Sequence, residues 1–221
     1  MELSVGKLKI FVAVLTATVL SGCALTRSEV DVSVGSPTTA SIREPSDDKT
    51  VFISSVRDQR AFHESPSSPN IPSLDPSATS SDAIKQRAVG RKRNGWGKAM
   101  GDILLSEGTT VASLTSAAIR RAFSEKGYKT LDDAGQVTPD TYVVDADIDQ
   151  FWTWMNPGFW ALTISTEIST NLKIREGSSE KSALISVKAA DTFQTGLESN
   201  YIEVMNAALT QYIEELKLKL Q

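Results

Sequence analysis

Three acidic residues at alternate positions, Asp145, Asp147 and Asp149, have the spacing that opens a calcium-binding loop. Such a loop also requires glycine at its sixth position and glutamate at its twelfth, where this sequence has Gln150 and Asn156. Alternation with period two instead places the three carboxylates on one face of a strand. We therefore interpret them as the solvated face of a sheet and predict no metal site.

Candidates for catalysis by side chains are few. Asp147 and Glu167 would be the carboxylate pair of a glycosidase, but on a flat solvated face nothing raises the pKa of a general acid. A serine nucleophile would need His63, the one histidine, as its base, and His63 lies in a proline- and serine-rich stretch. The sequence therefore predicts a protein that is not an enzyme and binds no cofactor.

Aromatic residues gather where two expected strands meet in an Asn-Pro-Gly turn. Aromatic side chains at a protruding tip are typical of membrane-interface anchors and of partner contacts. The alternative is that the rings fold back over the open end of the core. We predict a membrane or partner contact made by Phe151, Trp152, Trp154, Phe159 and Trp160.

A basic cluster precedes the first expected helix and contains Arg91, Lys92 and Arg93. Such a cluster suits a contact with anionic lipid, lipopolysaccharide phosphate or an acidic protein, and its alternative is a solvated loop. The whole chain has a formal net charge of -4. A mildly acidic protein does not suit broad binding to phosphate backbones, so no nucleic-acid partner is expected.

The elements that position these residues follow from hydrophobic periodicity. Four segments are predicted strands, of which the last three alternate with period two and form an antiparallel meander. A helical period marks two further segments, the second beginning near Asn200. The expected fold class is α+β, a mainly antiparallel sheet of about four strands with two helices packed on one face. The strands are 51–57, 141–150, 161–175 and 182–190, and the helices are 109–126 and the C-terminal segment.

The proline- and serine-rich segment 61–95 shows no sustained apolar period. A structureless stretch of this length is usually disordered or functional. We expect it to be a disordered loop within a single α+β domain that spans residues 50–221.

The start of the chain has the organisation of an export signal. Lys7 and Lys9 precede an apolar run, Ile10 to Leu20, that is too short to span a bilayer but has the length of a signal-peptide core. The run leads directly into Leu20-Ser21-Gly22-Cys23, which contains the only cysteine of the chain. This pattern resembles the lipobox of bacterial lipoproteins.

The lipobox resemblance implies that residues 1–22 are cleaved between Gly22 and Cys23. Cys23 would then carry a diacylglycerol on its sulfur and a fatty acyl group, such as palmitate, on its new amine. Several acyl chains hold a protein stably at a membrane. Residues 23–49 are then the lipidated cysteine and a flexible linker to a periplasmic domain. Ala24 follows the cysteine where an aspartate would favour the inner membrane, so we expect the outer membrane, at its periplasmic face.

Three short patterns together resemble the YajG-like family of bacterial lipoproteins, and the likeness extends over most of the chain after the leader. The resemblance implies an envelope lipoprotein of largely unassigned activity and brings no catalytic residues with it. The segment 61–95 and the tryptophans near Met155 depart from the family pattern. The patterns are Val51-x-Ile53-x-x-Val56-x-Asp58-x-Arg60, Lys126-Gly127-Tyr128 and Asn206-Ala207-Ala208-Leu209.

These observations favour an outer-membrane-anchored, non-enzymatic binding or assembly factor in the periplasm, with an envelope protein or polymer as its partner. Two alternatives remain open from the sequence. One is an envelope-polymer (peptidoglycan) hydrolase that uses the acidic face. The other is a lipid-transport auxiliary lipoprotein, which would need an apolar cavity.

Overall fold

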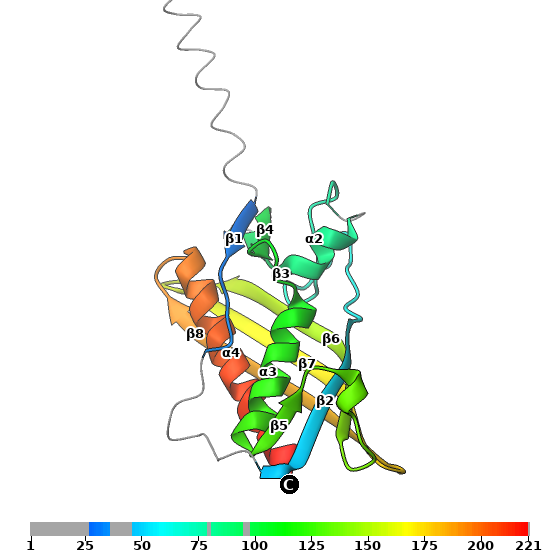
Figure 1. Ribbon diagram of the computed structural model, residues 1–221. Helices are drawn as coiled ribbons and strands as arrows, with labels where there is room; N and C mark the ends of the chain where they lie inside the picture. Colours follow the sequence, from blue (N-terminus) through cyan, green and yellow to red (C-terminus); the bar gives the residue numbers. More distant parts are fainter. Residues whose placement is uncertain (1–26, 36–45, 79–80, 95–97, 221) are drawn as a thin grey trace, which may run out of the picture.

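The computed structural model describes residues 27–35, 46–78, 81–94 and 98–220, and the side chains of 46–48 are not described. In this part of the chain a curled sheet carries two long helices, which lie side by side on one of its faces (Figure 1). The strands are β1 (Arg27–Val30), β2 (Ser46–Asp58), β3 (Ala88–Arg93), β4 (Ala99–Leu105), β5 (Tyr128–Leu131), β6 (Tyr142–Pro157), β7 (Leu162–Glu176) and β8 (Ser179–Phe193). The helices are α2 (Asp82–Arg87), α3 (Val111–Glu125) and α4 (Glu198–Lys219), with a 3₁₀ turn at Ala134–Gln136.

Strand β6 is the centre of the sheet. The strand order is β1-β4-β3-β6-β2-β5, while β7 pairs with β6 and β8 pairs with β7. The pairings β1–β4, β2–β5, β2–β6 and β3–β6 are parallel, and β3–β4, β6–β7 and β7–β8 are antiparallel. The first half of β6 therefore lies beside β2, and its second half lies beside β3.

The predicted fold class is wrong in strand number and in strand direction. The described residues form a mixed sheet of eight strands, whereas the sequence indicated about four, mainly antiparallel. The missed strands β1, β3, β4 and β5 have only four to seven residues each. All four pair in parallel with a strand far away in the sequence, and only β3 and β4 are also joined by a local hairpin.

The antiparallel meander itself is confirmed by the continuous pairing of β6, β7 and β8. The predicted inward face is also confirmed, because Val144, Ala146 and Ile148 are buried, and so are their counterparts Ile164, Ile168 and Ile185 on the next two strands. Helix α4 begins slightly earlier than expected. Leu197 is its N-cap residue, and its backbone N–H donates to the Asn200 side chain at 3.1 Å.

The apolar residues form two clusters, one on each face of the sheet. The larger cluster lies under α3 and α4 and includes Phe123, Tyr212 and Phe151. A bulge after Ile148 shifts the register of β6. Beyond the bulge, Phe151 and Met155 join the larger cluster. Trp152 and Trp154, which point to the opposite face of β6, belong to the smaller one. The smaller cluster consists of Leu74, Ala78, Ala88, Leu104, Trp152 and Trp154.

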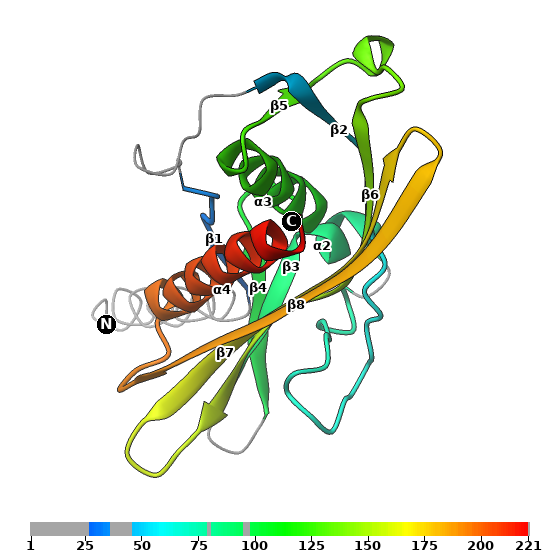
Figure 2. The same cartoon turned by 90° about the horizontal axis from the view of Figure 1, so that it is seen from below.

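Residues 59–78, which we call the cover segment, close the smaller cluster. The segment runs along the face of the sheet opposite to α3 and α4 (Figure 2). Its backbone carbonyls accept hydrogen bonds from β6, from Trp152 Nε1 to Pro69 at 3.2 Å and from Gln150 Nε2 to Asn70 at 2.9 Å. The expectation of a disordered loop at 61–95 is therefore wrong for its described residues, which form the cover segment, α2 and β3.

Candidate functional site

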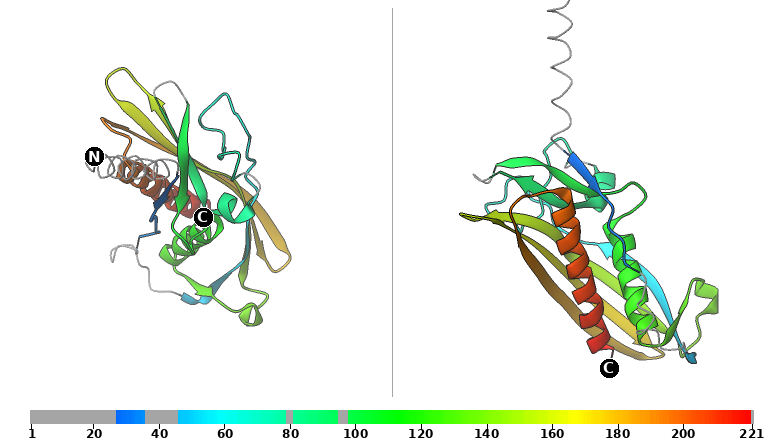
Figure 3. Two further views of the ribbon diagram at one scale, coloured as in Figure 1. Left: turned by 90° about the horizontal axis from the view of Figure 1, so that it is seen from above. Right: turned by 90° about the vertical axis from the view of Figure 1, so that its left-hand side faces the viewer.

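One end of the sheet brings together the β6–β7 turn, the β3–β4 hairpin and the start of β1. Because β3 runs parallel to β6, with Gly90 opposite Thr153, the two hairpins point the same way. Because β1 runs parallel to β4, with Arg27 opposite Asp102, the chain enters β1 from this same end. We call it the hairpin end, and Figure 3 (left) shows both hairpins projecting on one side of the molecule.

The turn between β6 and β7 presents the most exposed large apolar side chains at this end. Phe159 is 89% exposed and Trp160 is 84% exposed, and their rings meet edge to face with centroids 4.7 Å apart. The turn is closed by a hydrogen bond from the Gly158 N–H to the Ala161 carbonyl at 2.8 Å. A Cβ at position 158 would lie 2.5 Å from that carbonyl oxygen, so the tight turn requires glycine.

The other three aromatic residues of the predicted contact lie in the interior. Phe151 is buried under the helices, and Trp152 and Trp154 are buried under the cover segment. The Phe62 ring packs edge to face on Trp152, and the Lys188 ammonium lies 5.0 Å from the Trp154 ring centroid. The predicted contact is wrong for these three residues, because the fold buries them, and it stays a prediction for Phe159 and Trp160.

The basic cluster is engaged within the fold. Arg91 is buried, donates to the Leu74 carbonyl at 2.6 Å and lies 3.5 Å from Asp102. Arg93 lies 3.5 Å from the Ser73 hydroxyl, and burial together with the charge of Arg91 lowers its pKa. Arg91 and Arg93 line a cavity of about 260 Å³ beside the cover segment. The predicted solvent-facing anionic contact is therefore corrected to arginines that hold the cover segment to β3.

Lys92 points to the opposite face of β3 and fastens the start of the described chain. Its ammonium donates to Ser28 at 2.6 Å and pairs with Glu198, and Ser28 donates to Glu198 at 2.8 Å. The hydrogen bonds from Lys92 and Ser28 lower the pKa of Glu198 to about 2. This cluster ties β1, β3 and the first turn of α4 together at the hairpin end.

Buried Asp102 connects three segments near the same end. Its carboxylate accepts from the Asp75 N–H at 3.1 Å, and it lies beside Arg91 of β3 and Arg27 of β1, the latter 3.8 Å away. Burial raises the pKa of Asp102 despite these partners. Asp102 of β4 therefore joins the cover segment to β1 and β3.

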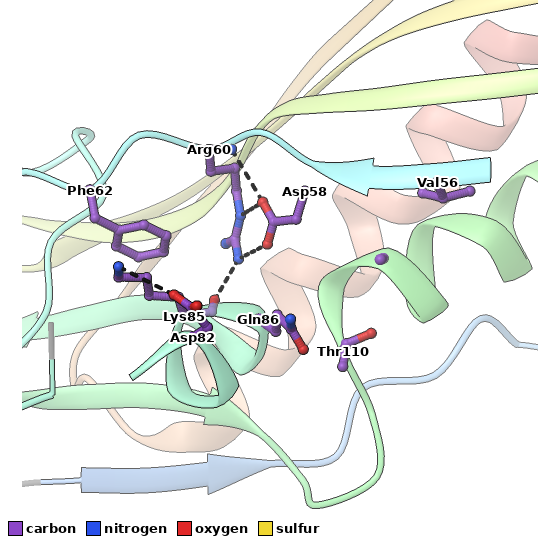
Figure 4. Close-up of a pocket in the computed structure, with 9 residues that line it drawn as sticks. Val56, Asp58, Arg60, Phe62, Asp82, Lys85, Gln86 and Thr110 are labelled. Atoms are coloured by element: carbon purple, nitrogen blue, oxygen red, sulfur yellow. Dashed lines mark hydrogen bonds and ion pairs between the residues drawn. The ribbon is translucent and has the colours of Figure 1, made fainter. Parts of the chain in front are cut away.

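Arg60 is the most completely bonded charged side chain of the described residues. Its guanidinium makes a bidentate pair with Asp58 at 2.7 and 2.8 Å and donates to the carbonyls of Lys85, Ala88 and Phe151. Figure 4 shows the guanidinium between Asp58 and the C-terminal turn of α2, with the Phe62 ring beside it. All five N–H donors of the arginine are used. The Asp58-x-Arg60 pattern, noted from the sequence only for its family resemblance, is therefore a structural clamp.

A cavity of about 400 Å³ opens beside this clamp and is lined by Asp58, Arg60, Phe62, Lys85 and Thr110, among others. A second cavity, of about 380 Å³, lies at the opposite end of the sheet and is lined by Lys49, Tyr128, Tyr142 and Glu176, among others. Both linings mix charged and aromatic groups. Neither cavity has the apolar wall that an acyl chain would need.

The remaining sequence candidates do not converge on a reaction centre. Asp147 forms a bidentate pair with Arg57 at 2.6 and 2.9 Å, which lowers the pKa of Asp147. Glu167 stands opposite Trp152 in the register, away from Asp147. The backbone N–H of His63 donates to the Pro72 carbonyl within the cover segment. Among the described residues there is no group of three or more His, Cys, Asp or Glu side chains placed to hold a metal ion.

Gly22 and Cys23, the predicted cleavage and lipidation residues, lie outside the described part of the chain. Searching the segments that the structure describes, we find no helix with the length and hydropathy to cross a bilayer.

No protein-family model and no curated protein matches the chain. Among solved structures, an uncharacterized protein is similar with a TM-score of 0.47 and 10% identity over 89% of this chain and 99% of that one. A Xanthomonas campestris protein of the DUF330 family has a TM-score of 0.45 and 12% identity over 87% and 92% of the two chains. A putative neuraminyllactose-binding hemagglutinin homolog from Helicobacter pylori has a TM-score of 0.34 and 11% identity over 86% and 94%. At such scores these neighbours assign neither a family nor a function.

Proposed function

We propose that this protein is an envelope lipoprotein, held by acylated Cys23 at the periplasmic face of the outer membrane, where it acts as a non-enzymatic binding or assembly factor. The lipobox, Leu20 to Cys23 behind an apolar run, carries this proposal. Cys23 precedes the first residue of β1, Arg27, by four positions. An extended chain of that length reaches about 14 Å at most.

Because β1 begins at Arg27 and pairs within the sheet, the tether is much shorter than the flexible linker expected for residues 23–49. A short tether supports a defined orientation of the domain at the membrane. The chain enters the sheet at the hairpin end, so that end lies close to the membrane that holds Cys23. The opposite end, with the β7–β8 turn and the cavity of about 380 Å³, then faces the periplasm and a protein or polymer partner.

The hydrolase alternative has less support. A general acid needs a raised pKa at its working pH, whereas Arg57 lowers the pKa of Asp147. The lipid-transport alternative is not favoured by the two cavities described above, since charged side chains contribute to the walls of both.

The test begins with intact-mass analysis of the protein purified from membranes. The expected mass is that of a chain starting at Cys23 with three acyl chains, and Cys23→Ser should move the protein from the membrane fraction to the soluble fraction. A bare thiol, or a retained Met1, would contradict the anchor.

The second part of the proposal is tested by incubation with purified peptidoglycan and by crosslinking in cells. We expect no released fragments, and released saccharides would contradict a non-enzymatic role. A photocrosslinker at exposed Leu184 on β8 should capture an envelope partner, whereas one at buried Trp154 should not.

A further inference from the structure

We propose that the β6–β7 turn is a second membrane contact, which inserts Phe159 and Trp160 into the interface of the same bilayer that holds Cys23. The proposal rests on the lipidation proposed above. In this arrangement the acyl chains retain the protein at the membrane, and the aromatic β6–β7 turn sets the orientation of the domain.

The placement of exposed apolar side chains supports this contact. Six large apolar residues of the described chain are exposed, and four of them lie at or next to the hairpin end. Met100 follows the first residue of β4, and Leu197 follows the end of β8, which pairs with the start of β7. The four residues are Met100, Phe159, Trp160 and Leu197.

The charge distribution along the meander points to lipid at this end. No charged residue occurs from Gln150 to Thr166. The opposite turn, between β7 and β8, is flanked by Lys173, Arg175, Glu176, Glu180 and Lys181. Entering the bilayer interface is costly for charged side chains and favourable for aromatic rings, which occupy the headgroup level.

The turn is built to hold its aromatic residues outward. Below it, Thr153 and Thr166 share a buried hydrogen bond of 2.8 Å between β6 and β7, and both strands pack on the core. Gly158 closes the turn through the Ala161 carbonyl. A rigid support lowers the conformational entropy that insertion would otherwise cost.

The direction of the chain distinguishes a lipid contact from a protein contact. A partner protein could meet aromatic residues on any side of the domain. These residues instead lie where the chain emerges toward Cys23, at most about 14 Å of extended chain from Arg27. We therefore assign the turn to the lipid interface and make a protein partner an outcome of the test.

The test uses the lipidated full-length product reconstituted into vesicles of phosphatidylethanolamine and phosphatidylglycerol. Cys23 is the only cysteine, so after its acylation an introduced cysteine is the single site for a nitroxide label. Asn156→Cys places the label beside the turn and keeps both aromatic residues, and Ser178→Cys places it on the opposite turn. Both positions are exposed.

We expect the label at 156 to be several-fold more accessible to oxygen than to a water-soluble nickel complex, and the label at 178 to show the reverse. Adding Phe159→Ser and Trp160→Ser to Asn156→Cys should move that label into water while the protein stays on the vesicles.

Several outcomes would overturn the proposal. They are a label at 156 that remains in water, labels at both positions in lipid, and a label at 156 that stays in lipid after both serine substitutions. Shielding of position 156 from both reagents in native membranes, combined with exposure to water in pure vesicles, would assign the turn to a protein partner instead. If Cys23 is not acylated, the wild-type chain itself takes up label, so failure of the anchor is distinguished from failure of the turn.

Discussion

Two groups of aromatic residues on one hairpin have opposite environments. Trp152 and Trp154 are buried between β6 and the cover segment, whereas Phe159 and Trp160 project into solvent a few residues further along. The local sequences are similar, since both groups lie within an uncharged, aromatic-rich stretch. The difference comes from the cover segment, which is distant in sequence and packs on Trp152 and Trp154 but not on the turn. The base of the hairpin therefore contributes to the core, and its tip exposes two aromatic rings to solvent.

The largest expected effect comes from removing a covered ring. Trp152→Ala should lower the free energy of unfolding by about 3–5 kcal/mol, because it leaves a large cavity between β6 and the cover segment. Chemical denaturation measures this loss. A change below about 1 kcal/mol would mean that the cover segment does not pack on this ring in solution.

Arg60→Lys tests the clamp that holds the start of the cover segment. Lysine cannot reproduce the bidentate pair with Asp58 and the three carbonyl contacts, so we expect a loss of about 3 kcal/mol in unfolding free energy. Arg57→Lys is the matched control, because Arg57 makes a similar bidentate pair with Asp147 in solvent. Equal stabilities of the two variants would contradict a special role for the buried pair.

Asp102→Asn should release the far part of the cover segment at a smaller cost. The amide keeps the volume but loses the charge that faces Arg91 and Arg27. Because burial already disfavours this charge, we expect a loss of only about 1 kcal/mol in unfolding free energy. Faster amide hydrogen exchange at Asp75, relative to the wild type, would locate the effect. Unchanged exchange at Asp75 would show that the carboxylate does not hold the segment.

The cluster around Glu198 predicts a modest pH effect. The folded pKa of about 2 lies below the ordinary value of 4.5, so the contribution to stability is complete above about pH 4.5 and is lost as the pH falls toward 2. Glu198 is 46% exposed, so solvent screening limits the contribution to about 1 kcal/mol or less. Glu198→Gln should flatten the pH dependence of unfolding between pH 5 and 2, and an unaltered slope would contradict the cluster.

Substitution of the two exposed aromatic residues of the β6–β7 turn is expected to have the smallest effect on stability. Phe159→Ser with Trp160→Ser should change the unfolding free energy by no more than about 0.5 kcal/mol, because neither ring packs on the core. Acrylamide should quench the fluorescence of Trp160 strongly in the soluble Cys23→Ser form and that of Trp152 and Trp154 weakly. Strong quenching of all three would remove the distinction between the two groups.

The sequence predicted much of the local structure and little of the connectivity. Period-two alternation indicated the buried faces of β6, β7 and β8, and the helical period indicated α3 and α4, because side-chain direction follows from local geometry. The parallel strands β1, β3 and β5 were missed because they are short and pair with distant segments. Gly90 shows such a distant contact, since a Cβ there would lie 2.7 Å from the Thr153 carbonyl oxygen.

The candidate site likewise combines features that the local sequence determines with features that only the tertiary structure determines. The lipobox at Cys23 and the aromatic character of the β6–β7 turn are local patterns, and the sequence alone provides them. Which rings face solvent was decided by the tertiary structure, because both faces of the second half of β6 are apolar and alternation there does not distinguish core from surface. The covering residues approach from about eighty positions away, as the bond from Trp152 to Pro69 shows, and such a contact has no signature in the neighbouring sequence.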